Sequence, residues 1–388
     1  MKPHGWCAAA LTAIIASGAW AAPFQPARDD VVLETLPFRP TDPGVRRLQV
    51  LHAQLAMQPG NLAIAVELGR RYVELGRVTG DPRYAGYAQA ALAPWWSAPD
   101  PPRDVLMLRA TLYQRVHRFD DALADLRLAL ERNPRDAQAR LTRATVLQVR
   151  GEFEAARRDC EALQTTVQEL IAIACLASID GGTGGLRSAY RGLRSALMRT
   201  SVADAGVRVW VLTGLAEMAS RAGLFEDADA HFKAALAADA SDQYLLAAYA
   251  DYLLDRGRAS EAAALVKDHT QADGLLLRYA LALQRQRLAE ASQRIAELRS
   301  RFDASRLRGD RVHLREEARF ALDLAGDPKT ALALAKENWT VQKEPADARV
   351  LLDAARAAGD RASIDAITRW IEKTHLEDVH LRVAHPSG

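Results

Sequence analysis

Alanine and leucine recur at helical spacing along most of the chain, and short polar turns interrupt them. Between positions 45 and 57, for example, three leucines share one face of a helix: Leu48, Leu51 and Leu55. Strong helix formers are abundant, whereas β-branched residues are sparse outside short runs. The pattern therefore predicts an all-α protein in which each helix buries one face.

The same spacing of small residues returns at a fixed period. Pairs of alanines stand 34 positions apart in two stretches of the chain: Ala110 and Ala144, Ala122 and Ala156, Ala216 and Ala250, Ala228 and Ala262. Self-similarity at a period of 20 to 50 residues is typical of proteins in which helix hairpins stack. Each hairpin leaves an apolar face uncovered, so neighbouring units must pack on one another.

These alanines, together with Leu68-Gly69-Arg70-Arg71-Tyr72 and Pro134, resemble the tetratricopeptide repeat (TPR), here of the exported bacterial type. The resemblance implies a right-handed α-solenoid of TPR-like helix hairpins. It is regular over residues 103–168 and 209–273, and degenerate over 171–197. The loop around Gly76, Gly80 and Pro82 is longer than the family's hairpin turn.

The sequence predicts four segments along the chain. Residues 1–21 read as a signal peptide, with Lys2, a short apolar run and a small-x-small site at Ala19-Trp20-Ala21. Residues 22–44 are rich in proline and are expected to be extended, residues 45–374 form the solenoid, and residues 375–388 form a polar tail. No later apolar segment is long enough to span a membrane, so a periplasmic or secreted location is expected.

Export leaves Cys160 and Cys175 in the mature chain. An oxidising compartment makes a disulfide plausible, and two separate buried thiols are the alternative. The two cysteines lie on consecutive predicted helices, where the regular repeats give way to the degenerate unit. A disulfide there would link the regular repeats to the degenerate unit.

No motif for catalysis or cofactor binding is found. The glycines at 181–185 lack the lysine and hydroxyl residue of a phosphate-binding loop, and no zinc-binding HExxH or nucleophile elbow occurs. Carboxylates sit in arginine-rich helices, where solvated ion pairs explain them. The formal charge of +2 gives no reason to expect nucleic acid as a partner. We therefore expect no enzyme, no cofactor and no metal.

The TPR resemblance implies a partner-binding groove on the concave face, lined by the first helix of each hairpin. The expected lining is Met107, Thr111, Gln114, Arg115, Leu141, Thr145, Gln148, Trp210, Glu217, Arg221, Tyr244 and Asp251. The lysine and asparagine of the family's carboxylate clamp are not found at the corresponding positions. The sequence therefore predicts an exported scaffold for an unknown protein or peptide.

Two alternatives stay open at this point. One is a structural or self-associating component of the cell envelope. The other is an aromatic-lined protein that binds a glycan or another ligand through Trp95, Trp96 or Trp210.

Overall fold

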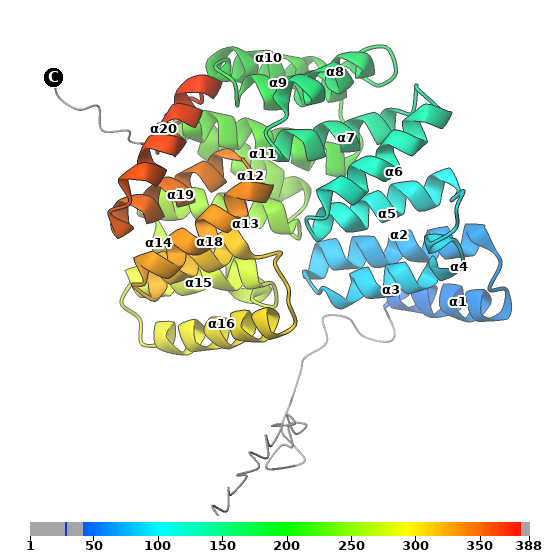
Figure 1. Cartoon of the computed structure of the whole chain (residues 1–388), viewed down its shortest axis with the longest axis horizontal. Coiled ribbons are helices and arrows are strands. Elements are labelled where there is room, and N and C mark those ends of the chain that lie inside the picture. The colour runs from blue at the N-terminus through cyan, green and yellow to red at the C-terminus, as the bar shows by residue number, and fades with distance from the viewer. Residues whose placement is uncertain (1–27, 29–41, 382–388) are drawn as a thin grey trace, which may run out of the picture.

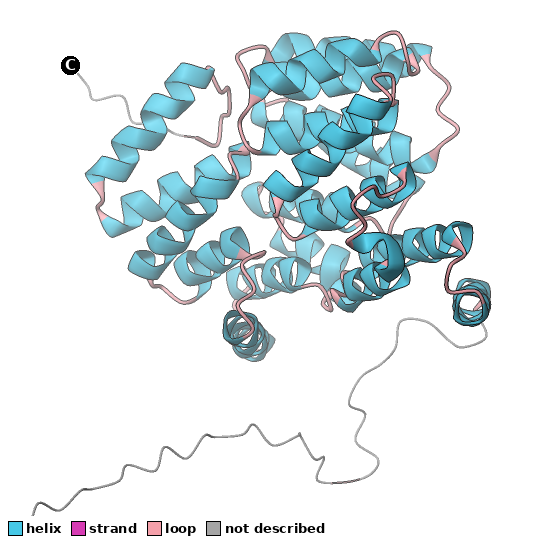
Figure 2. Cartoon of the chain, turned by 45° about the vertical axis from the view of Figure 1, so that its right-hand side comes forward, coloured by secondary structure: helices cyan, strands magenta, loops and turns pink. Residues whose placement is uncertain are grey.

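A computed structural model describes residue 28 and residues 42–381, and the regular elements in this part of the chain are all helical (Figure 2). The predicted signal peptide lies outside the described residues. The first helices are α1 (Pro43–Met57), α2 (Leu62–Thr79), α3 (Arg83–Ala91), α4 (Ala93–Trp96), α5 (Arg103–Arg115), α6 (Phe119–Arg132), α7 (Ala137–Val149), α8 (Phe153–Leu163), α9 (Glu169–Asp180) and α10 (Leu186–Arg199). They are followed by α11 (Ala205–Arg221), α12 (Phe225–Ala238), α13 (Gln243–Asp255), α14 (Ala259–Val266), α15 (Asp273–Arg285), α16 (Glu290–Leu307), α17 (Leu314–Arg319), α18 (Pro328–Val341), α19 (Pro345–Ala358) and α20 (Arg361–Thr374). A 3-10 turn (Lys267–His269) follows α14, and a π-helical turn (Phe320–Leu324) extends α17.

Consecutive helices pack as antiparallel hairpins, as the 34-residue period predicts (Figure 1). All eight repeated alanines are buried, with at most 2% of their surface exposed. Their small side chains let the two helices of a hairpin approach closely, and larger residues such as Leu126 and Phe232 fill the space between hairpins. The fold is therefore a TPR-like α-solenoid.

Several hairpins begin with the same type of N-terminal helix cap. The carboxylates of Asp136, Asp204 and Asp242 accept a hydrogen bond from the third backbone N–H of α7, α11 and α13, respectively. Such caps satisfy backbone donors that a helix start leaves unpaired. Each cap fixes where the inner helix of a hairpin starts, and so which side chains reach the concave face.

The superhelix curves until its early and late parts meet. Nη1 of Arg77, at the end of α2, lies 2.5 Å from the Asp242 carboxylate at the start of α13, and Gln243 donates to the Val78 carbonyl at 2.9 Å. Gly80 has a positive φ of 70°, and a Cβ atom there would lie 2.6 Å from the Cβ of Ala272. The long loop after α2 is therefore the point where two distant turns touch.

A second contact joins the middle of the chain to its end. The backbone N–H of Lys343, between α18 and α19, donates to the Val149 carbonyl at 2.7 Å. Gly151, with φ of 78°, gives room for the Lys343 side chain, 3.1 Å from where a Cβ would lie. Ion pairs from α17 and α19 to α13 place the C-terminal helices against the concave side of α13 (Figure 1).

Residues 375–381, the described part of the predicted tail, dock on the ends of the middle hairpins. Glu377 accepts a hydrogen bond from the N–H of Leu186 at the start of α10, and the N–H of Val379 donates to the Arg221 carbonyl. Leu376 and Leu381 are buried. This segment covers the end of the concave face next to α9 and α11.

Cys160 in α8 and Cys175 in α9 form a disulfide across the boundary between a regular and a degenerate hairpin. Both cysteines belong to one buried apolar cluster with Leu163 and Ile179. The bridge and this cluster together hold α9 against α8.

We expect the double substitution Cys160→Ala with Cys175→Ala to lower the free energy of unfolding by about 3 kcal/mol, because a loop of this length then regains its entropy in the unfolded chain. Urea unfolding of wild type and variant, each with and without reductant, measures the difference. Reductant should shift the wild-type curve to that of the variant and leave the variant unchanged. Identical curves for all four samples would show that the bridge contributes nothing.

Candidate functional site

The curved superhelix surrounds a cavity of about 1490 Å³ that is partly open to solvent. One wall comes from the inner helices α7, α11 and α13, and the opposite wall from α17, α19 and the segment 375–381. The concave surface that the sequence predicts as a groove therefore faces the C-terminal helices across this cavity. A ligand on it would contact the C-terminal helices as well.

Ten of the twelve expected groove residues line this cavity: Gln114, Arg115, Leu141, Thr145, Gln148, Trp210, Glu217, Arg221, Tyr244 and Asp251. The other two are not in its wall. Met107 is buried in the core, and Thr111 turns its hydroxyl back to the Met107 carbonyl. Both residues lie nearer the start of α5, whereas Gln114 and Arg115 at its end reach the cavity.

The arginines at the ends of the inner helices hold the solenoid together. Arg115 donates to the Gly76 carbonyl at 2.9 Å, Arg221 to the Gly181 carbonyl at 2.8 Å, and Arg285 to the Leu254 carbonyl at 2.5 Å. Each guanidinium thus binds a carbonyl group at the end of the preceding inner helix, where the helix dipole is negative. Their first role is structural, although all three also border the cavity.

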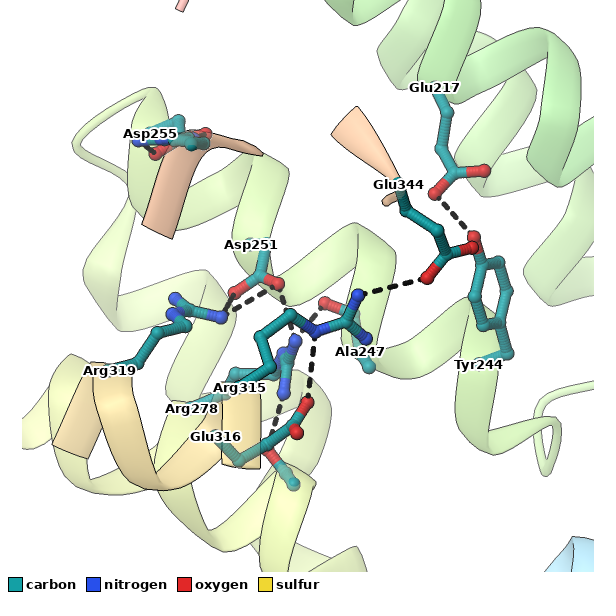
Figure 3. Close-up of polar contacts among 12 residues, drawn as sticks. Glu217, Tyr244, Ala247, Asp251, Asp255, Arg278, Arg315, Glu316, Arg319 and Glu344 are labelled. Atoms are coloured by element: carbon teal, nitrogen blue, oxygen red, sulfur yellow. Dashed lines mark hydrogen bonds and ion pairs between the residues drawn. The ribbon is translucent and has the colours of Figure 1, made fainter. Parts of the chain in front are cut away.

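A buried ion-pair network joins the two walls (Figure 3). Asp251 of α13 contacts Arg278 of α15 at 2.6 Å and Arg319 of α17 at 3.0 Å, and Asp255 binds Arg349 of α19 at 2.6 and 2.8 Å. Desolvation opposes the charged form of Asp251, but the two guanidinium groups prevail and lower its pKa to about 2. The C-terminal helices are therefore fastened to α13 by charge.

Beside this network lie two carboxyl groups, Glu217 and Glu344, that have fewer arginines in contact with them (Figure 3). The Tyr244 hydroxyl donates to Glu217 at 2.9 Å. Burial raises the pKa of Glu217 to about 7, and the nearby charge of Glu344 adds to the shift. Burial also raises the pKa of Glu344, although Arg315 lies 3.1 Å away. The site thus holds a carboxyl group that changes charge near neutral pH.

Aromatic and hydroxyl groups complete this part of the wall. Trp210 is 39% exposed and Tyr244 is 58% exposed, and both rings border the cavity. Thr213, one helical turn before Glu217, is 2% exposed, and its hydroxyl has no hydrogen-bond partner among the described residues. We refer to Trp210, Thr213, Glu217, Tyr244 and Glu344 as the inner site.

The other predicted aromatic residues have different surroundings. Trp96 packs edge-on against Tyr113, and its carbonyl accepts a hydrogen bond from Arg109. Trp95 packs against the first hydrophobic cluster, with Leu92 and Val105. Neither tryptophan lies close to Trp210. Within residues 42–381, no cluster of histidine, cysteine or carboxylate side chains is arranged to hold a metal ion.

Sequence reasoning missed Glu344 and Arg315, which face the inner site from the C-terminal wall. They come from a loop and a short helix outside the regular repeats, so the repeat pattern has no position for them. No signal in the sequence shows that residues 315 and 344 reach α11 and α13.

We expect Glu217→Gln to raise the free energy of unfolding near pH 8.5 by about 1 to 3 kcal/mol, with little change near pH 5. The pKa of Glu217 is higher in the folded protein (about 7) than its ordinary value of 4.5. Its contribution to stability is therefore present at low pH and is lost as pH rises through 7. Glutamine keeps an oxygen for the Tyr244 hydroxyl and cannot ionise.

Urea unfolding at the two pH values measures this difference. The exposed Glu131 of α6 offers a matched control, because Glu131→Gln removes one carboxylate at the surface. A Glu217→Gln effect that is equal at both pH values, or a loss of stability near pH 8.5, would contradict the assignment.

Comparison with known proteins gives only structural likenesses. No family model matches the sequence, and no curated protein sequence matches it. Among solved structures, a tetratricopeptide repeat protein from Parabacteroides merdae ATCC 43184 is 14% identical with a TM-score of 0.37, over 75% of this chain and 97% of that one. A monomeric mutant of IFIT1 with Gppp-AAAA is 13% identical with a TM-score of 0.39, over 87% and 84% of the two chains. Yeast Tom70 is 13% identical with a TM-score of 0.22, over 84% and 95%. The description of this chain as a TPR-like solenoid therefore depends on its own 34-residue period and stacked hairpins.

Proposed function

We propose that this protein is a non-catalytic scaffold that binds an extended peptide or a protein segment inside its superhelix. The observation that supports this proposal is the cavity of about 1490 Å³, bordered by solvent-exposed aromatic and polar side chains. Pockets for small molecules usually measure about 300 to 1,000 Å³. The larger volume favours a chain-like ligand.

The wall chemistry supports the same proposal. Gln114, Thr145 and Gln148 offer hydrogen-bonding groups on one side, and Trp210 and Tyr244 offer flat apolar surface nearby. An extended peptide has both a polar backbone and apolar side chains to match. A ligand would therefore be held between the inner helices and the C-terminal wall.

A ligand that needs more room than the cavity offers would have to part the contact between α2 and α13. The Arg77–Asp242 contact involves side chains that are 39% and 18% exposed. Ion pairs near the surface contribute about 0 to 1 kcal/mol. Opening at this contact is therefore expected to cost little compared with the interactions that a ligand gains.

We also propose that the protein acts outside the cytoplasm, in the periplasm or after secretion. The disulfide between Cys160 and Cys175 supports this location, because such bridges persist in oxidising compartments. No helix within residues 42–381 is long and apolar enough to cross a membrane. The expected signal at residues 1–21 is consistent with export.

Gly214→Phe tests the binding proposal by filling the cavity. Gly214 lies on α11 in the cavity wall, and a Cβ added there meets nothing within 4 Å. We expect the variant to fold and to retain at most about a tenth of the peptide that wild type retains, which corresponds to a loss of about 1.4 kcal/mol. The measurement uses immobilised protein and a pool of decapeptides, randomised over Ala, Gly, Ser, Leu, Lys, Arg, Asp and Glu.

Gly192→Phe is the matched control, because Gly192 is an equally open helical glycine of α10 that does not border the cavity. It should retain as much peptide as wild type. If wild type retains no peptide, or if Gly214→Phe retains as much as Gly192→Phe, the proposal is wrong.

A further inference from the structure

The inner site exposes two aromatic rings inside the molecule. Trp210 on α11 and Tyr244 on α13 belong to neighbouring inner helices and are open to the cavity. Leaving aromatic surface in water forgoes the stabilisation that packing would give, at about 25 cal/mol per Å². A ligand that covers these rings would recover this stabilisation. Aromatic faces also attract cations through the negative charge of their π-systems.

Carboxylates outnumber the cations that are available to the inner site. Arg315 is shared among Glu344 at 3.1 Å, Asp347 at 3.4 Å and Glu316 at 3.5 Å. Glu217 has no ion pair within 4 Å among the described residues, and its one hydrogen bond comes from the Tyr244 hydroxyl (Figure 3). The site therefore has room for one more positive charge.

The other arginines near the site already have partners. Arg221 donates to the Gly181 carbonyl, and Arg278 donates to Asp251 and to the carbonyls of Ala247 and Gly274. Moving Arg221 to Glu217 would take this donor from the Gly181 carbonyl, and moving Arg278 would remove one of the two guanidinium groups that bind Asp251. The charge that Glu217 lacks must then come from outside the chain.

A buried hydroxyl points to a ligand independently of the carboxylates. Thr213 is 2% exposed and borders the cavity, and its Oγ1 has no hydrogen-bond partner among the described residues. An unpaired buried hydroxyl costs about 1 to 3 kcal/mol, so native structures rarely leave one. Thr213 precedes Glu217 by one helical turn on the same face of α11. A donor bound at Glu217 would lie within reach of this oxygen.

We propose that the inner site binds a lysine or arginine side chain of the peptide that occupies the cavity. The ammonium or guanidinium group forms an ion pair with Glu217 and Glu344 and donates to Thr213 Oγ1. The stem of the side chain lies against the rings of Trp210 and Tyr244. This inference depends on the proposed function, since it names the kind of peptide that the cavity selects.

An acidic ligand does not fit this site. A carboxylate or phosphate placed beside Glu217 and Glu344 would meet like charge, and the arginines around it are already bound. A free amine shares the recognised chemistry but would leave most of the cavity empty. The experiment therefore includes a small amine as a separate arm.

The composition of the retained decapeptides tests the inference. We expect lysine and arginine to be enriched over aspartate and glutamate by about threefold or more in the fraction that wild type retains. Retention without this enrichment would overturn the inference and leave the proposed function intact. No retention at all would overturn both.

Two substitutions assign the enrichment to the inner site. Glu217→Gln and Trp210→Leu should each weaken binding of a single lysine-containing decapeptide by about tenfold, measured by fluorescence anisotropy. The controls Glu131→Gln and Tyr87→Leu change an exposed carboxylate and an exposed ring outside the cavity wall, and should leave binding unchanged. Equal losses in variants and controls would contradict the assignment.

Spermidine separates a peptide side chain from a free amine. It should compete with the lysine-containing decapeptide only at concentrations well above the decapeptide's own dissociation constant. If spermidine binds as tightly as the decapeptide, the site recognises small amines and the inference is wrong.

The pH dependence of peptide affinity separates a loss of charge at Glu217 from a change in packing, because a packing change alone would not depend on pH. Glu217 is faced by Tyr244 of α13, Arg221 of α11, Arg315 of α17 and Glu344 of the loop before α19. The pKa of Glu217, about 7, means that this group gains its charge as pH rises from 6 to 8. The affinity of wild type for the lysine-containing decapeptide should rise over this range, and that of Glu217→Gln should not. An equal rise in both proteins would contradict the role of Glu217.

Discussion

Two ion pairs on α13 determine the shape of this molecule. Asp251 binds Arg319, and Asp255 binds Arg349, so the last hairpins are drawn across the concave face of the middle ones. The backbone hydrogen bond from Lys343 to Val149 fixes the same arrangement at the other side. A TPR-like solenoid without these contacts would present an open groove. Here the inner helices become one wall of a cavity, and Asp251 and Asp255 are placed opposite arginines of the C-terminal helices.

This enclosure explains the chemistry of the inner site. Burial in the cavity wall disfavours ionisation wherever a guanidinium group is not in contact. Asp251 has two such groups and a pKa of about 2, whereas Glu217 has none in contact and a pKa of about 7. Two carboxyl groups on adjacent inner helices thus behave oppositely because of their partners. The difference makes Glu217, next to exposed rings, the natural place for an external cation.

The sequence predicted the local structure well, because local structure depends on spacing. The 34-residue period located the hairpins, and all eight repeated alanines are buried as the pattern requires. It also marked the loop at Gly80 and the cysteine pair. It could not show that Gly80 touches Ala272 or that Glu344 faces Glu217, since these contacts depend on the summed curvature of many hairpins. Nor could spacing separate Arg115 and Arg221, which hold helix ends, from free groove residues. Asp125 and Asp159, expected in solvated pairs, are buried against Arg109 and Arg143.

Hydrogen exchange at the backbone amide of Lys343 tests the closed superhelix most directly. This amide lies between α18 and α19, and its hydrogen bond goes to Val149, far away in the sequence. If the superhelix is closed in solution, the amide should exchange at least about a hundredfold more slowly than an unprotected loop amide, because it is released only when the walls separate. Exchange at the unprotected rate would show that the C-terminal helices do not stay against the concave face, and the account of a two-walled cavity would then be wrong.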